Sequence, residues 1–229
     1  MVKHDIYNNM RFYRKINTLL ILLLLINTVT EAKESILVVG GTGRVGSEIV
    51  KILANENKDI TVLSRSDSNY SRLRDLNIDY IKGDVLNDKD IERVFLAKEY
   101  NVVINALAKV GNSPNPHAVG QNNLIKWSKK TGINHFILIG SVGAGPIQSE
   151  LVSDTVWSMW KEILQEKGKA EDSLINSNLP FTIIRTGIVV YDNTPPTGNA
   201  ELIEDDTIVG IITRKDLAAL TGECVLNSL

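Results

Sequence analysis

The sequence predicts an α/β protein with a doubly wound parallel sheet and helices on both faces. Short apolar runs rich in β-branched residues alternate with stretches whose apolar residues recur at helical spacing. A cluster of four glycines, within residues 40–46, separates the first such run from the first such helix. The length of 229 residues and the 43% hydrophobic content allow one α/β domain with a substantial core.

The periodicity of the apolar residues places the individual elements. Strands are expected over residues 36–39, 59–63, 78–81, 101–108, 135–140 and 180–185. A first helix is expected over residues 44–55, and a second should begin at a cap at Asn87 or Asp88. A third should follow the loop 111–116, and a fourth is expected over roughly 155–175 with an interruption near Gly168. A short polar helix through Arg72 and a final helix behind a capping box at residues 213–216 complete the pattern.

The glycine cluster has the spacing G-x-x-G-x-x-G at Gly40, Gly43 and Gly46. The first glycine permits a sharp turn after the strand, the second lets a pyrophosphate approach the backbone, and the third lets the helix pack closely on the strand. The N–H groups at the helix start then favour phosphate. The loop predicts a dinucleotide site in a Rossmann-like fold, although a turn without a ligand would need similar glycines. Its predicted cofactor-binding residues are Gly40, Thr42, Gly43, Arg44, Val45 and Gly46.

The end of the second strand indicates which dinucleotide binds. An NAD site usually has Asp or Glu here to hold the adenosine ribose, whereas this chain has Ser64, Arg65 and Ser66. A guanidinium matches the geometry of a phosphate and keeps its charge, so Arg65 favours the 2′-phosphate of NADP(H) over NAD(H). The nearby Asp67 weakens this distinction, and Arg65 as a solvated loop residue is the alternative.

Residues after the third and fourth strands complete the predicted cofactor site. Asp84 could accept a hydrogen bond from the adenine amino group, or it could simply stabilise a turn. Small residues at the end of the fourth strand would let the cofactor lie on the backbone, although core packing explains Leu107 equally well. The predicted residues in these two places are Asp84, Val85, Asn105, Ala106 and Leu107.

Several motifs together resemble the atypical short-chain dehydrogenase/reductase superfamily, and its NmrA-like, NAD(P)-binding branch in particular. The resemblance covers the chain from about Ile36 to its end. The motifs that carry the resemblance are Gly40-Gly41-Thr42-Gly43-Arg44-Val45-Gly46, Arg65, Gly83-Asp84-Val85, residues 136–141, residues 179–187 and residues 212–218. The branch usually has proline where Thr186 stands.

The resemblance implies two catalytic residues and one missing partner. Ser141 matches the serine that polarises a substrate carbonyl, and Lys167 matches the lysine that binds the nicotinamide ribose and lowers the pKa of a tyrosine. That tyrosine should stand four residues before the lysine, where this chain has Ile163, or Gln165 if Lys169 is the counterpart instead. No tyrosine lies between Tyr100 and Tyr191. Because hydride delivery to a carbonyl needs a proton source, ordinary keto-reductase chemistry is in doubt.

Two functions follow from these residues. The first is an NADP(H)-binding oxidoreductase that reduces a small carbonyl, quinone or flavin molecule. The second is a non-catalytic dinucleotide-binding protein that senses redox state or supports assembly of a complex, and the missing tyrosine favours it. The oligomeric state stays open. A net charge of −2 gives no case for nucleic acid, and a single cysteine with three scattered histidines gives none for a metal site.

The first 32 residues differ in character from the remainder. Basic residues precede an apolar run at 19–26, and small residues at Thr30 and Ala32 follow a short polar stretch. This order is typical of a secretory signal peptide, with Met10 as an alternative start. We therefore expect a leader over residues 1–32 and a dinucleotide-binding domain over 33–229 with a small C-terminal substrate lid. An uncut leader would instead anchor the protein to a membrane.

Overall fold

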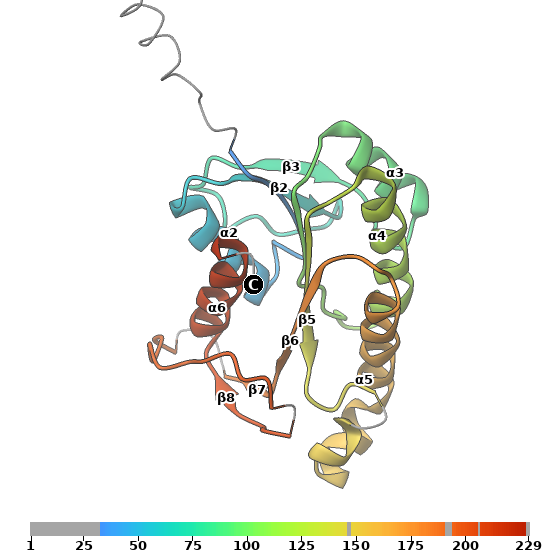
Figure 1. Cartoon of the computed structure of the whole chain (residues 1–229), viewed down its shortest axis with the longest axis vertical. Helices are drawn as coiled ribbons and strands as arrows, with labels where there is room; N and C mark the ends of the chain where they lie inside the picture. Colours follow the sequence, from blue (N-terminus) through green and yellow to red (C-terminus); the bar gives the residue numbers. More distant parts are fainter. Residues whose placement is uncertain (1–32, 146–147, 191–193, 206, 228–229) are drawn as a thin grey trace, which may run out of the picture. The chain divides into compact units, whose positions relative to one another are not determined.

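A computed structural model describes residues 33–227 except 146–147, 191–193 and 206, so the expected leader lies outside the described residues. From Glu34 onward the chain forms one compact unit. Six parallel strands form its main sheet in the order β3-β2-β1-β4-β5-β6, which confirms the predicted parallel α/β architecture (Figure 1). The strands are β1 (Ser35–Val39), β2 (Asp59–Ser64), β3 (Asp79–Lys82), β4 (Val102–Asn105), β5 (His135–Ser141) and β6 (Phe181–Thr186).

The first strand lies at the centre of the sheet and is buried along its whole length. Val38 is in register with Val62 of β2 on one side and with Ile104 of β4 on the other. A strand covered on both faces needs apolar side chains pointing both ways, which explains the continuous apolar run in the sequence. The glycine loop therefore begins at the middle of the sheet, between the two halves of the fold.

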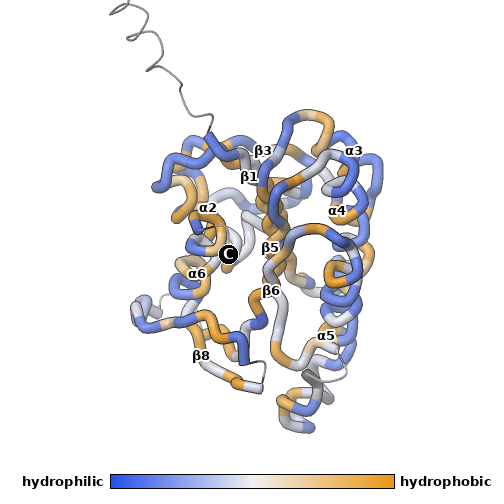
Figure 2. Tube along the Cα trace, in the orientation of Figure 1, coloured by the Kyte–Doolittle hydropathy of each residue, from blue (hydrophilic) through white to orange (hydrophobic). Residues whose placement is uncertain are grey.

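Helices cover both faces of the sheet. One hydrophobic cluster joins the sheet to α2 (Arg44–Asn55) and α6 (Arg214–Leu226). A second cluster joins the other face to α3 (Asp88–Ala97), α4 (His117–Thr131) and α5 (Asp154–Ile175). Figure 2 shows hydrophobic residues gathered along the central strands between these two layers. Among the described residues, no helix has the length and apolar character that crossing a bilayer requires.

Side-chain caps fix the starts of three helices. The Asn87 side chain accepts a hydrogen bond from the Lys89 N–H at the start of α3, which resolves the choice between Asn87 and Asp88. Ser153 caps α5 through the Val156 N–H. Thr213 caps α6 through the Asp216 N–H, which confirms the predicted helix start, while the Asp216 carboxylate accepts from the Thr213 hydroxyl.

Two expectations about helices were wrong. The segment through Arg72 forms turns rather than a helix, because Leu73 alone among residues 71–76 is fully buried and gives the segment little apolar surface to pack. Helix α5 continues through Gly168 without interruption. A Cβ at Gly168 would lie 2.6 Å from the Gly145 backbone nitrogen, so this glycine permits a close approach between helix and loop.

The chain after β6 forms a small additional unit beside the main sheet. Strands β7 (Ile188–Val189) and β8 (Ile211–Ile212) pair in parallel, and the loop between them is fastened to α6. The Asp216 carboxylate accepts hydrogen bonds from the backbone N–H groups of Thr197 and Gly198, at 2.9 and 3.0 Å. This is the segment in which the sequence places a substrate lid, and that role stays a prediction.

Candidate functional site

The glycine loop turns between β1 and α2 in a way that only glycine allows. Gly40 has φ +81°, and a Cβ there would lie 2.6 Å from the Ala106 carbonyl oxygen. A Cβ at Gly46 would collide with the Gly40 carbonyl oxygen. The loop thus packs against the end of β4 and against the first turn of its own helix, with no room for side chains at either position.

The start of α2 is open to an anionic group. Gly43 is its N-cap residue, no side chain caps the helix, and its first turn holds no acidic residue. Among the other predicted loop residues, Thr42 is half-buried, Arg44 is exposed, and Val45 packs against the core. Uncapped N–H groups at a helix start, next to glycines without Cβ atoms, fit the pyrophosphate of a dinucleotide.

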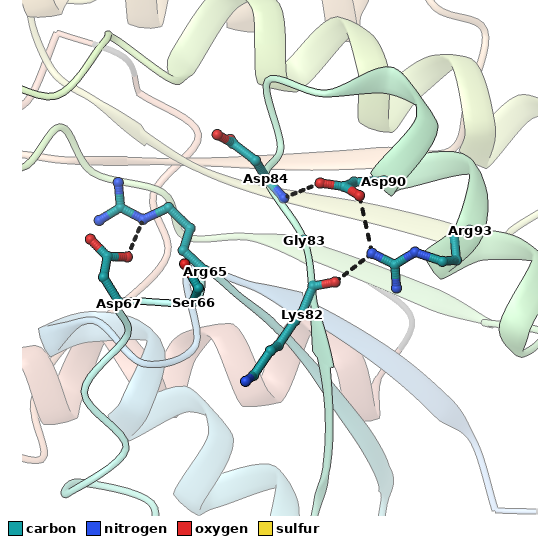
Figure 3. A pocket seen from close by; sticks show the side chains of 8 residues that line it. All are labelled: Arg65, Ser66, Asp67, Lys82, Gly83, Asp84, Asp90 and Arg93. Atoms are coloured by element: carbon teal, nitrogen blue, oxygen red, sulfur yellow. Dashed lines mark hydrogen bonds and ion pairs between the residues drawn. The ribbon is translucent and has the colours of Figure 1, made fainter.

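Beside the loop, the ends of β2 and β3 border a pocket of about 600 Å³ (Figure 3). Arg65 follows β2, and its Nε lies 3.3 Å from the Asp67 carboxylate. Both side chains are well exposed, at 44% and 69%, so this ion pair is weak. Arg65 can therefore pair with another anion in place of Asp67. The pocket is lined by Arg65, Ser66, Asp67, Lys82, Gly83, Asp84, Asp90 and Arg93.

On the β3 side of the pocket, the charged groups are partly engaged with one another. Arg93 donates to the Lys82 carbonyl at 2.6 Å and to Asp90 at 3.1 Å, and Asp90 accepts from the Asp84 N–H (Figure 3). Asp84 lines the pocket, and its carboxylate accepts from the Leu86 N–H at 2.9 Å, the role of a turn residue. Its contact with adenine stays a prediction.

Val85 and the residues that end β4 lie deeper in the fold. Val85 is buried, and its side chain occupies the space that a Cβ on Gly120 of α4 would need. Asn105 is 2% exposed, and its side-chain amide donates to Gln121 of α4 at 2.6 Å. The backbone of Ala106 lies against Gly40 of the glycine loop, and the Leu107 side chain packs partly against the core. The contacts of both residues with a cofactor stay predictions.

The structure brings the two predicted catalytic residues to one region at the end of β5. Ser141 is the last residue of that strand, and its hydroxyl donates to the Val142 carbonyl at 3.0 Å. Lys167 of α5 donates to the carbonyls of Ile139 and Gly140, at 3.0 and 3.2 Å. Burial of the ammonium lowers the pKa of Lys167 to about 8, while the Glu171 carboxylate opposes this shift. Lys167 is therefore mostly charged at neutral pH but close to titration.

A buried ion pair supports this region, and the sequence analysis missed it. Glu171 is 3% exposed and accepts from Arg185 of β6 at 2.8 Å and from the Ser141 N–H at 3.4 Å. Burial raises the pKa of Glu171, and the Arg185 hydrogen bond opposes that rise. The spacing of four residues between Lys167 and Glu171 puts both on one face of α5, and this was the available signal.

The position expected for a tyrosine is occupied by the half-buried Ile163. Two other polar residues reach the interior nearby, on α4. His117 is 4% exposed, and burial, together with the charge of Lys167, lowers its pKa to about 3. Gln121 lies one turn further along the same helix and is fully buried. The sequence analysis noted His117 only as one of three scattered histidines.

Comparisons with known proteins agree with this geometry. A protein-family model described as NAD(P)H-binding matches residues 40–228. Protein TIC 62, chloroplastic, from Oryza sativa subsp. japonica is 25% identical over 227 residues, which cover 87% of this chain and 44% of that protein. Sanguinarine reductase from Eschscholzia californica is 35% identical over 108 residues, covering 44% of this chain and 36% of that protein. This chain thus spans less than half the length of these two relatives.

A solved structure supports the fold assignment. The structure titled as ChuY, an anaerobillin reductase from Escherichia coli O157:H7, superposes with a TM-score of 0.74 at 22% identity. The match covers 83% of this chain and 90% of that one. Because the family model spans most of the chain and the superposition shows a Rossmann-like fold, the protein belongs to the NAD(P)H-binding family.

Proposed function

We propose that this protein is an oxidoreductase that binds NADP(H) in preference to NAD(H) and reduces a small carbonyl, quinone or flavin molecule. The reduced nicotinamide supplies the hydride when it is bound. The glycine loop and the start of α2 would hold the pyrophosphate. Ser141 and Lys167 would lie at the reacting end, near the ends of β4 and β5.

The preference for NADP(H) rests on Arg65. Its guanidinium lines the pocket at the end of β2, where an NAD site usually presents a carboxylate to the ribose. The exposed carboxylate of Asp67 already forms an ion pair with this guanidinium, so the same cation can serve a 2′-phosphate. On the β3 side, Lys82 and Arg93 are balanced by Asp84 and Asp90, so the preference depends on Arg65.

Reductase activity is supported by two similar proteins, a sanguinarine reductase and an anaerobillin reductase. It is also supported by Lys167, whose ammonium is held by two β5 carbonyls beside Ser141. A lysine close to titration at neutral pH suits a site where a proton must accompany a hydride.

Titration of the purified protein with NADPH and NADH, followed by cofactor fluorescence, tests the preference. NADPH should bind the wild type more tightly, and Arg65→Asp should weaken NADPH binding by roughly tenfold, the equivalent of one charged hydrogen bond. Arg74→Asp makes the same charge change on the neighbouring turn segment, outside the pocket lining, and should leave both affinities unchanged. Equal affinities for both cofactors, or an unaffected Arg65→Asp variant, would remove the claim.

The second candidate function is a dinucleotide-binding redox sensor or assembly factor without catalysis. The observation that favours it is Ile163 at the tyrosine position. NADPH oxidation measured against quinones, flavins and aldehydes separates the two functions. Turnover with any of them supports the oxidoreductase, whereas tight NADPH binding without turnover across the whole panel supports the sensor.

A secretory leader over residues 1–32 stays a proposal with its own test. N-terminal sequencing of the protein expressed in its source organism should find a chain that begins near Lys33 if the leader is removed. A chain that retains the apolar run at 19–26 would favour a membrane anchor instead.

A further inference from the structure

One peptide group at the end of β5 is held by two side chains of α5. The carbonyl of this peptide group belongs to Gly140 and accepts a hydrogen bond from the Lys167 ammonium at 3.2 Å. Its N–H belongs to Ser141 and donates to the Glu171 carboxylate at 3.4 Å. The two predicted catalytic residues, Ser141 and Lys167, are thus joined through a peptide group that Glu171 also contacts.

Gly140 makes the contact with Glu171 possible. A Cβ at this position would lie 2.5 Å from an oxygen of the Glu171 carboxylate and 3.0 Å from the Ile183 side chain. The φ angle of Gly140 lies outside the left-handed region, so its backbone conformation does not itself require glycine. We therefore attribute the glycine to the close approach of the carboxylate to β5.

The Glu171 carboxylate is buried and accepts from two donors. It is 3% exposed and accepts from Arg185 of β6 at 2.8 Å as well as from the Ser141 N–H. Arg185 and Lys167 are the cations that act on it, and the His117 imidazole on α4 is neutral at pH 7 because its pKa is about 3. Replacing a buried ion pair with apolar side chains of similar size is often neutral or stabilising, so stability alone does not account for a carboxylate here.

Building on the proposed oxidoreductase function, we propose that Glu171 is a positioning residue for the reacting end of the site. Its carboxylate, for which Gly140 leaves room, fixes the peptide group that begins Ser141 and holds the Lys167 ammonium. Glu171 acts through these two residues and not on the substrate. Since one peptide group connects them, displacement of the carboxylate moves the serine and the ammonium together, and a misplacement of about 1 Å can lower a rate about 10²-fold.

Nuclear magnetic resonance of the full chain tests these contacts without cofactor or substrate. Only two peptide groups in the chain join a glycine to a following serine, Gly46–Ser47 and Gly140–Ser141. Labelling with carbonyl-¹³C glycine and ¹⁵N serine therefore marks the peptide group in question together with an internal control in the glycine loop. The Gly140 carbonyl signal should titrate with a midpoint near the pKa of Lys167, about 8, while the Gly46 signal should not. A Gly140 signal that stays constant between about pH 6.5 and 9.5 would overturn the proposal.

Glu171→Gln tests whether the carboxylate acts on Lys167. The amide offers one acceptor oxygen where the carboxylate serves two donors, so one of the two contacts is lost. Because the Glu171 charge raises the pKa of Lys167, its removal should lower the midpoint at Gly140 by about one pH unit. Asp172→Asn removes a carboxylate from an exposed position of the same helix and should leave the midpoint unchanged. An unchanged midpoint in Glu171→Gln would overturn the proposal as well.

Steady-state kinetics with the active panel compound tests the positioning role itself. Glu171→Gln and Gly140→Ala both disturb the contact of the carboxylate with β5, so each should lower kcat about tenfold or more while NADPH binds within about threefold of the wild type. The double variant should be no slower than the slower single variant, because both changes remove the same contact. Asp172→Asn should match the wild type. Effects that multiply in the double variant, or an unchanged kcat in Glu171→Gln, would contradict the proposal. If Glu171→Gln does not fold, Gly140→Ala replaces it in both experiments, with labelled alanine in place of glycine.

Failure of this inference can be distinguished from failure of the proposed function. If the wild type does not bind NADPH or turns over no panel compound, the proposed function fails, while the titrations at Gly140 still decide whether Glu171 acts on Lys167 through this peptide group. If NADPH is oxidised but Glu171→Gln leaves the Gly140 midpoint and kcat unchanged, the proposed function stands and Glu171 has no positioning role.

Discussion

Two charged regions lie on either side of the glycine loop, and they differ in burial. The Arg65 region, at the ends of β2 and β3, is exposed, and its central ion pair spans 3.3 Å between side chains that are 44% and 69% exposed. The Lys167 region, near the end of β5, contains Glu171 and His117 at 3% and 4% exposure. Ion pairs between exposed side chains are weak, and each member can pair with another ion instead. A buried charge, in contrast, destabilises the folded protein when its ion-pair partner is removed. We therefore expect the first region to tune ligand choice and the second to affect stability and chemistry.

The same substitution made in both regions should give the largest contrast. Arg185→Met leaves the Glu171 carboxylate buried without its ion-pair partner, so the free energy of unfolding should fall by about 3–5 kcal/mol. Arg65→Met removes an exposed pair and should change it by less than about 0.5 kcal/mol. Urea denaturation measures both. Equal effects of the two variants would contradict the comparison.

The next effect is a loss of stability in acid that comes from His117. Its pKa is about 3 in the folded protein and 6.5 in an ordinary environment, so the unfolded chain binds the proton more readily between these values. The free energy of unfolding should therefore decrease as pH falls from about 6.5 towards 3, by roughly 2–4 kcal/mol from this group.

His117→Gln should remove this part of the acid dependence, whereas His135→Gln should remove less because that side chain is only half-buried. Denaturation curves for the three proteins at a series of pH values check this. If the wild type and His117→Gln lose stability in parallel, the imidazole is not the buried neutral group that the structure shows.

A substitution in the glycine loop, between the two regions, should have an intermediate effect. The Cβ of Gly46→Ala collides with the Gly40 carbonyl oxygen, so α2 must move away from β1. We expect a loss of about 1–3 kcal/mol in stability, as for overpacked cores, together with loss of NADPH binding. Thermal denaturation and cofactor titration measure the two effects. Gly111→Ala is a suitable control, since nothing lies within 4 Å of its Cβ, although its φ of +54° makes a small cost expected there too.

The smallest expected effect is a gain in affinity at the exposed region. Asp67→Asn removes the carboxylate that competes for Arg65, so NADPH should bind up to about fivefold more tightly, in keeping with an exposed pair worth about 0.2–1 kcal/mol. Cofactor titration at low salt measures this gain. Weaker NADPH binding in this variant would mean that Asp67 itself contacts the cofactor.

The sequence predicted those features of the fold that depend on local pattern. The run 36–39, the loop at Gly40 and the capping box at Thr213 each carry their signal within a few neighbouring residues. The turns around Arg72 were mistaken for a helix because a helix there would need an apolar partner elsewhere in the chain. Whether a glycine breaks a helix or serves a close contact also depends on tertiary packing, as Gly168 shows.

In the candidate site as well, the residues that could be predicted are those whose signal lies in the local sequence. Arg65 and Asp84 could be named from their positions after strands, because the ends of parallel strands meet at one edge of a sheet. The pairing of Glu171 with Arg185 joins a helix to a strand, and the hydrogen bond from Asn105 to Gln121 joins a strand to another helix. Contacts of this kind depend on how helices pack across the sheet, and one sequence without an alignment does not reveal them.

The uncapped start of α2 has a consequence for how the protein responds to its surroundings. Glycine in place of a side-chain N-cap costs a helix a few tenths of a kcal/mol, and a bound pyrophosphate would accept from the uncapped N–H groups. Since a ligand that binds only the folded state raises its stability in proportion to the logarithm of its concentration, heat resistance should follow the local supply of dinucleotide. A protein that meets no cofactor would survive for less time, so its abundance would itself record the nucleotide content of its compartment.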